Sequence, residues 1–272
     1  MTIRIDDALI TSQIAIPLQE GWVETEIPVA FSSRMRASEV GPDDVALISS
    51  AEATMLTTTH VIAPEVAVVM NGIGPIAMRT PVRPDEVEET MVRLHGCGAT
   101  AEILIRALLR SYFGITASSF AYIDEEQGDD EPQVVIVDDA VGLSQPESGH
   151  QVDLARAWFI LTGQAVVSHV TVVGLEAQAR GGGKELEVLQ AAVGAGVERR
   201  KEVRGRIAER SGADRDVLAE VTNRLRFELT LEDRISLANL AARGSWGSRF
   251  GHTIPVFRDA LKVEDDAAQG VS

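Results

Sequence analysis

Three short apolar segments constrain the fold most. Each is typical of a buried strand and ends at a small or polar residue. They are residues 45–48, 134–137 and 166–173. Between and around them, residues 101–112 and 152–161 carry apolar side chains at helical spacing. Alternating strand and helix patterns of this kind predict an α/β fold with a mainly parallel sheet.

The sequence changes character after three consecutive glycines at residues 181–183. From 184 to 243 it is rich in helix formers and charges and has no convincing strand, which predicts a helical C-terminal portion. Within this portion, Thr230 followed three residues later by Asp233 resembles a capping box. Residues 263–272 are predicted to form an acidic tail.

Charge and residue usage exclude several classes of function. The chain has 41 acidic and 25 basic residues, a net charge of −16, whereas binding to nucleic acid depends on clustered Lys and Arg. The single cysteine, Cys97, can form neither an internal disulfide nor a cysteine-rich metal site, and the five histidines lack ligand spacing. The glycines at 72 and 74 lack the third glycine of a dinucleotide-binding loop. We therefore predict no metal, no cofactor and no nucleic-acid partner.

Two further features concern the location of the protein. Asp6 and Asp7 interrupt the first seven residues, which therefore do not resemble a signal peptide. The most apolar stretch, residues 61–78, is broken by Pro64 and Pro75 and is a poor candidate for a membrane span. The sequence thus predicts a cytoplasmic protein that has no membrane partner.

Two junctions between a strand and a helix are the candidate ligand-binding elements. Ligands of open α/β sheets bind where unpaired helix N–H groups face the carboxyl ends of strands. Ser49–Ser50 form the first junction, and residues 95–100, with two glycines, form the second. Each junction alone also fits an ordinary N-cap, whereas together they favour a clamp for a small carboxylate. His169 is either a structural histidine or an acid, base or hydrogen-bond donor of the site.

Four segments then define a family pattern. They read DVALISSAE at 44–52, GPIAMRTPV at 74–82, VIVDDA at 135–140, and DLARAW followed by LTG within 153–163. In this order they resemble the menaquinone-biosynthesis enzymes of the futalosine route, specifically the chorismate dehydratase branch. The last segment is similar to the family pattern D-L-G-x-x-W-x-x-L-T-G and is the most specific of the four.

The resemblance implies a two-lobed fold like that of the type II periplasmic binding proteins, with the ligand in the cleft between the lobes. Lobe 1 would comprise residues 1–75 and 170–262, and lobe 2 would comprise residues 76–169, with crossings near 74–78 and 167–172. The expected substrate-binding residues are Ser49, Ser50, Gly74, Gly98, Ala99, Thr100, Asp139 and His169.

The chain departs from the family in its first loop. The family has the element Y-L-N-x-x-P, whose Asn takes part in the reaction, whereas residues 9–17 read LITSQIAIP. Depending on how the positions are counted, Ser12 or Ile14 replaces the Asn, so Ser12 is the candidate catalytic residue. We expect a chorismate dehydratase-like carbon–oxygen lyase with impaired or altered activity. The alternative is a non-catalytic, solute-binding-like protein for a small anion, and whether the chain forms a homodimer is left open.

Overall fold

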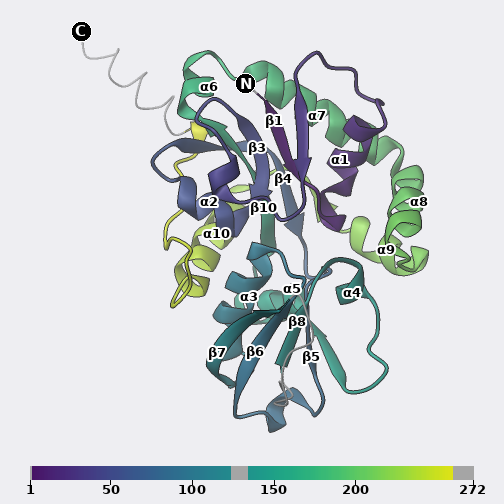
Figure 1. The fold of residues 1–272 in the computed structure, drawn as a ribbon, viewed down its shortest axis with the longest axis vertical. Coiled ribbons are helices and arrows are strands. Elements are labelled where there is room, and N and C mark those ends of the chain that lie inside the picture. Colours follow the sequence, from purple (N-terminus) through teal and green to yellow (C-terminus); the bar gives the residue numbers. More distant parts are fainter. Residues whose placement is uncertain (1, 124–133, 260–272) are drawn as a thin grey trace.

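The computed structural model of this chain describes residues 2–123 and 134–259. Two β-sheets, one above the other in Figure 1, carry helices on their faces, which confirms the predicted α/β class. The predicted acidic tail at 263–272 lies outside the described residues. Within the two described ranges, no helix is both long enough and apolar enough to cross a membrane.

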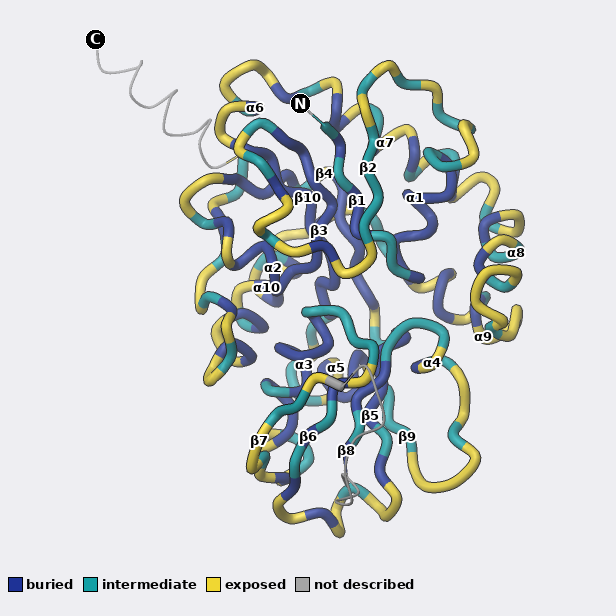
Figure 2. Tube along the Cα trace, in the orientation of Figure 1, coloured by how far each residue is buried: buried dark blue, intermediate teal, exposed yellow. Residues whose placement is uncertain are grey.

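The larger sheet has six strands in the order β11-β4-β10-β3-β1-β2. Their bounds are β1 Ile3–Asp6, β2 Val29–Ser32, β3 Val45–Ser49, β4 His60–Met70, β10 Val166–Gly174 and β11 Leu225–Arg226. Strand β1 runs parallel to β2 and β3, whereas β10 runs antiparallel to β3 and β4. All nine residues of β10 are buried, as expected for a central strand of a sheet that is covered on both faces (Figure 2).

The smaller sheet has five strands in the order β7-β6-β8-β5-β9. Their bounds are β5 Ala77–Thr80, β6 Glu89–His95, β7 Thr116–Ile123, β8 Val134–Val137 and β9 His150–Asp153. Strand β6 is parallel to β7 and β8, but β5 is antiparallel to β8 and β9. Both sheets are therefore mixed, and the prediction of a mainly parallel sheet was wrong. The chain leaves the larger sheet through β4 and returns through β10 after building the smaller sheet, so these two neighbours run in opposite directions.

Helices cover both faces of the larger sheet (Figure 1). Their bounds are α1 Ser12–Gln19, α2 Ser50–Ala53, α3 Ala99–Leu109, α4 Asp139–Leu143, α5 Leu154–Thr162, α6 Leu175–Ala179, α7 Gly183–Glu198, α8 Arg200–Ser211, α9 Arg215–Thr222 and α10 Leu231–Gly244. Strand alternation divides the core: Val45 and Leu47 pack in the cluster that includes α1 and α7, and Ala46 and Ile48 pack in the cluster that includes α2 and α10.

Two segments connect the sheets. Residues 71–76 lead from β4 to β5, and residues 163–165 lead from α5 to β10. Helix α5 is followed by Gly163 as its C-cap, with φ of 71°, a backbone conformation that glycine adopts readily. Two segments were expected to cross between the lobes. Residues 74–78 lie partly in β5, and residues 167–172 lie wholly within β10. The exact division into lobes therefore stays a prediction.

The C-terminal portion is helical, as predicted, from α6 to α10. Helix α10 begins with the predicted capping box, in which the Asp233 N–H donates to Thr230 Oγ1 at 3.2 Å and the Thr230 N–H donates to Asp233 Oδ2 at 2.9 Å. The exception is β11, because its two residues pair with β4 and gain their structure from that distant strand rather than from local pattern.

Candidate functional site

The carboxyl ends of β1, β2, β3 and β8 meet at a cavity of about 240 Å³ between the two sheets. We call this space the inner cavity. Three kinds of polar side chain line it. The carboxylates are Asp6, Asp7, Asp138 and Asp139; the basic groups are Arg34 and His169; and the hydroxyls are Ser33, Ser49, Thr100 and Ser168.

A second space of about 420 Å³, the outer cavity, adjoins the inner one because Asp6, Arg34 and Ser49 line both. Arg36 and Arg249 also line the outer cavity. Arg249 forms an ion pair with the buried Glu52, and its guanidinium lies 4.3 Å from the centre of the Phe250 ring. The outer cavity is thus bordered by three arginines, whereas carboxylates predominate in the inner cavity.

Asp6, His169 and Ser168 form a hydrogen-bonded chain along one wall of the inner cavity. His169 Nε2 lies 3.3 Å from Asp6 Oδ2, and His169 Nδ1 lies 2.9 Å from Ser168 Oγ. The other oxygen of Asp6 accepts the Met35 N–H at 3.1 Å. These two contacts, one to each ring nitrogen, hold the imidazole in one orientation.

Asp138 and Asp139 form the opposite wall. Asp138 is the N-cap of α4; its Oδ1 accepts the Asp139 N–H at 2.7 Å and its Oδ2 accepts the Gly98 N–H at 3.2 Å. Burial and the neighbouring Asp139 carboxylate raise the pKa of Asp138 to about 7. Burial also raises the pKa of Asp139 above its ordinary value. In the described part of the chain, no group of three or more His, Cys, Asp or Glu is arranged to hold a metal ion.

Asp139 links the two sheets and has an unusual backbone. Its φ is 53°, in the left-handed region that costs a non-glycine residue roughly 1 kcal/mol or more. Its Oδ1 accepts the N–H of Leu9, which follows β1, at 3.0 Å. Backbone strain of this kind concentrates at functional sites, and here it aims a carboxylate from the smaller sheet at the loop after β1.

Five of the predicted site residues line the inner cavity: Ser49, Gly98, Thr100, Asp139 and His169. Ser49 is the N-cap of α2, and its hydroxyl accepts the Glu52 N–H at 3.3 Å. Thr100 does not cap α3, because Gly98 is the N-cap and the Thr100 hydroxyl donates to the Ser168 carbonyl at 2.9 Å.

The other four predicted residues lie elsewhere. Ala99 lines the outer cavity. Ser50 is fully buried, and its hydroxyl donates to the carbonyls of Val167 and Ser168. Ser12 lines neither cavity, because it begins α1 and its hydroxyl points back to the Ala8 carbonyl at 3.2 Å. Gly74 lies at a separate, wider cavity.

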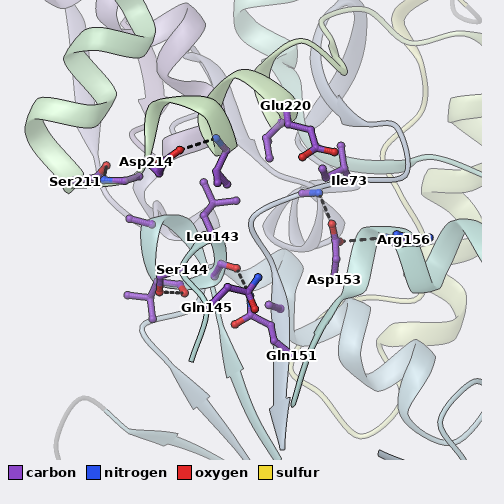
Figure 3. Close-up of a pocket in the computed structure, with 18 of the residues that line it drawn as sticks. Ile73, Leu143, Ser144, Gln145, Gln151, Asp153, Arg156, Ser211, Asp214 and Glu220 are labelled. Carbon is purple, nitrogen blue, oxygen red and sulfur yellow. Dashed lines mark hydrogen bonds between the residues drawn. The ribbon is translucent and has the colours of Figure 1, made fainter. Parts of the chain in front are cut away.

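That wider cavity, of about 970 Å³, lies between the α4, β9 and α5 region and the helices α8 and α9 (Figure 3). Asp153 points from the start of α5 toward the connecting segment, where its Oδ2 accepts the Gly74 N–H at 3.0 Å. Its Oδ1 accepts the N–H groups of Ala155 and Arg156, and Asp214 caps α9 in the same way. These carboxylates serve helix starts, so the inner cavity is the better candidate for a reactive site.

Cys97 lies beside the outer cavity but is not an activated nucleophile. Burial and the nearby Asp138 raise the pKa of its thiol well above the ordinary range. Its Sγ contacts the Ile136 carbonyl at 3.1 Å. This arrangement is that of a small packing residue.

The sequence reasoning missed Asp6, Arg34, Asp138 and Ser168. Asp138 stands beside the predicted Asp139, and Asp6 ends the first strand, so both carried the signal of a polar residue at a strand end. Arg34 carried no such signal, because only the path of the loop after β2 brings it to the cavity.

Two α/β units with polar side chains gathered between them define the class of periplasmic-binding-protein-like proteins. Protein AF1704 from Archaeoglobus fulgidus is similar, with a TM-score of 0.65, 12% identity and coverage of 90% of this chain and 97% of that one. The aliphatic sulphonate binding protein SsuA from Escherichia coli has a TM-score of 0.57, 11% identity and coverage of 88% and 84%. The alkanesulfonate-binding protein SsuA from Xanthomonas axonopodis pv. citri, bound to MOPS, has a TM-score of 0.59, 11% identity and coverage of 93% and 96%. These likenesses confirm the predicted type II periplasmic-binding-protein-like fold.

The family follows from the sequence itself. The family model described as menaquinone biosynthesis matches residues 16–245, most of the chain. The chain therefore belongs to the menaquinone biosynthesis family, as the segment pattern predicted. No curated protein matches the chain as a whole.

Proposed function

We propose that this chain binds a small carboxylate, with chorismate as the candidate, in the inner cavity and has weak lyase activity of the chorismate dehydratase type. The observation that carries the proposal is that five residues predicted to bind substrate line one cavity, which also holds the paired Asp6 and His169. We also propose that lobe 1 comprises residues 1–75 and 170–262 and lobe 2 residues 76–169, with the ligand between them.

The electrostatics support an anionic ligand that enters through the outer cavity. Arg34, Arg36 and Arg249 border that cavity, and bulk salt screens the remaining acidic surface beyond about 8 Å. Arg34 also lines the inner cavity and partly offsets the rise that burial causes in the pKa of Asp139, so its charge acts inside. The inner cavity alone is small, but with the outer one it falls within the range of roughly 300–1,000 Å³ typical of small-molecule sites.

Dehydration of chorismate asks little of the protein beyond orientation and charge stabilisation. The proton leaves the carbon that carries the enolpyruvyl ether, the neighbouring hydroxyl departs, and the ring becomes aromatic. The substrate's own side-chain carboxylate can serve as the base. Ser49 would donate to the ligand, since its hydroxyl oxygen accepts the Glu52 N–H, while Thr100 and His169, which are held by their own hydrogen bonds, would shape the site around it. Preorganised donors contribute most of the catalysis in such sites.

The expected activity is weak because the first loop offers no replacement for the family's Asn. The Ser12 hydroxyl donates to Ala8 O rather than into the cavity, and Ile14 is fully buried in the core. The loss of one preorganised donor typically lowers turnover by about 10²- to 10³-fold.

The same loop favours the alternative function, a non-catalytic binding protein for a small anion. Both functions predict binding in the inner cavity, but only the lyase predicts an aromatic product. Incubation of the purified protein with chorismate, followed by chromatographic detection of 3-enolpyruvylbenzoate, separates the two.

Binding itself is tested by Arg34→Gln, with Arg83→Gln as the matched control. Arg83 is exposed and pairs with Asp85 far from either cavity. We expect Arg34→Gln to weaken chorismate binding, measured by calorimetry, by about tenfold or more, since a charge-assisted hydrogen bond contributes about 1.5–3 kcal/mol. Equal affinities for wild type and Arg34→Gln would contradict the proposed site.

A further inference from the structure

The carboxyl group of Asp138 occupies an unusual position for an anion-binding site. It lies at the start of two helices, where it accepts N–H groups from α4 and from the N-cap of α3, and it lines the inner cavity. Its Oδ1 makes the shorter contact, 2.7 Å to Asp139 N, and its Oδ2 makes the longer one, 3.2 Å to Gly98 N. Each oxygen thus accepts one backbone N–H and keeps a second lone pair for a proton or a ligand.

The surroundings of Asp138 carry more negative than positive charge. The titratable and charged groups around Asp138 and the adjacent Asp139 come from several elements. They are Asp139 itself on α4, Asp6 on β1, His169 on β10, Arg34 after β2 and Cys97 before α3. Asp7 also lines the cavity, so Arg34 and His169 oppose four carboxylates. An anionic ligand that joined this set with all four carboxylates ionised would meet strong repulsion in a partly buried space.

We propose that Asp138 enters the ligand complex as a neutral carboxylic acid whose hydroxyl donates a hydrogen bond to a ligand oxygen, so that binding takes up one proton. The inference rests on the proposed function, because it assumes an anionic ligand in the inner cavity. Asp138 takes the proton because its carboxyl group lines the cavity next to the Asp139 carboxylate, and burial together with that neighbouring charge raises its pKa to about 7. During lyase turnover the same proton would pass to the departing hydroxyl, which leaves as water, and Asp138 would regain a proton from the substrate's carboxyl base or from solvent.

Proton uptake fixes the pH dependence of affinity. The carboxylates of chorismate stay ionised between pH 6 and 8.5, so a change in affinity over this range reflects the titration of a group in the protein and not in the ligand. If only the protonated form of Asp138 binds, the Kd rises about 30-fold from pH 6 to pH 8.5, and approaches a tenfold rise per pH unit above pH 7.

The experiment is calorimetry of chorismate binding from pH 6 to pH 8.5, in buffers of different ionisation enthalpy so that proton uptake is counted directly. Wild type should take up close to one proton at pH 8. Asp138→Asn keeps a planar group with an N–H donor but cannot titrate, so its affinity should be nearly independent of pH. A retained pH dependence in this variant would assign the proton to another group of the cavity and overturn the inference.

Asp139→Asn is the matched control on the same wall. Its amide oxygen can still accept the Leu9 N–H, which Asp139 holds at 3.0 Å. The variant removes the neighbouring negative charge that helps to raise the pKa of Asp138, so proton-linked binding should persist with its midpoint moved to lower pH. An unchanged midpoint would argue against Asp138 as the titrating group.

Failure of this inference is distinguishable from failure of the proposed function. Chorismate that binds without proton uptake overturns the inference alone. Chorismate that does not bind at any pH overturns the proposed function, and the inference is then decided on the free protein by the carboxyl ¹³C resonance that Asp138→Asn removes. A midpoint above pH 6 for this resonance supports the inference, and one below pH 5 refutes it.

Discussion

Two glycines in α7 should respond in opposite ways to the same substitution. A Cβ added at the buried Gly196 would lie 1.8 Å from the Gln13 carbonyl oxygen of α1, whereas nothing lies within 4 Å of a Cβ added at the exposed Gly194. Contacts shorter than 3.0 Å do not occur, so Gly196→Ala requires α7 and α1 to separate by at least about 1.2 Å locally. Overpacking of this kind costs about 1–3 kcal/mol.

Gly194→Ala gains helix propensity without a clash, so it should raise the free energy of unfolding by about 0.5–1 kcal/mol. Gly196→Ala should lower it by about 1–3 kcal/mol. Urea unfolding followed by far-ultraviolet circular dichroism measures both. If both variants change stability in the same direction, the close approach of α7 to α1 is not as described. The result also bears on the site, because α1 directly follows the 3₁₀ turn that contains Ile10 of the inner cavity.

Three further predictions concern single side chains. Ser12→Ala should leave chorismate affinity within about twofold of wild type by calorimetry, because the Ser12 hydroxyl bonds only to the chain's own backbone; a tenfold loss would return Ser12 to the site. Asp233→Ala should lower the free energy of unfolding, measured in urea, by about 2–4 kcal/mol. The substitution removes the capping box of α10 and two hydrogen bonds from Arg226, at 2.6 and 2.7 Å. As a control, Glu232→Ala at the exposed neighbouring position should have little effect. The raised pKa of Asp138, about 7 against 3.8, means that its carboxyl binds more protons in the folded than in the unfolded state between about pH 4 and 7, so the contribution of Asp138 to stability falls as the pH rises through this range. Relative to wild type, Asp138→Asn should therefore gain up to about 4 kcal/mol from pH 4 to pH 8 in urea titrations, and parallel pH profiles would contradict the assignment.

Features set by local chemistry were predictable from the sequence. The capping box at Thr230 depends on residues three apart, and the stop of α5 at Gly163 depends on a residue that tolerates positive φ. The strand at 45–48 followed from a run of apolar residues, and appears as β3. In each case the energetic cause lies within a few residues, so pattern alone is sufficient.

Features set by distant segments were not predictable in this way. The antiparallel pairing of β4 and β10 depends on where the chain goes across almost a hundred intervening residues. Arg34 lines the cavity only because the loop after β2 carries it there. For Ser12, a linear count located the loop but could not show that its hydroxyl turns back toward Ala8. Side-chain direction at the start of a helix depends on the helix register, which a motif with altered spacing does not determine.

The inner cavity is defined by bonds between segments that are far apart in the sequence. Asp139 accepts the Leu9 N–H across the two sheets, Asp138 accepts the Gly98 N–H, and Thr100 donates to Ser168 O. The amide of Gly98, one of the helix-start donors expected to hold a ligand carboxylate, is therefore already bonded to a carboxylate of the protein. The site consequently cannot rely on that donor alone to attract an anion. Arg34 and the arginines of the outer cavity must therefore attract the anion. The acids of the inner cavity repel it unless one of them takes up a proton. Measuring proton uptake on binding thus tests directly whether this cavity holds an anion.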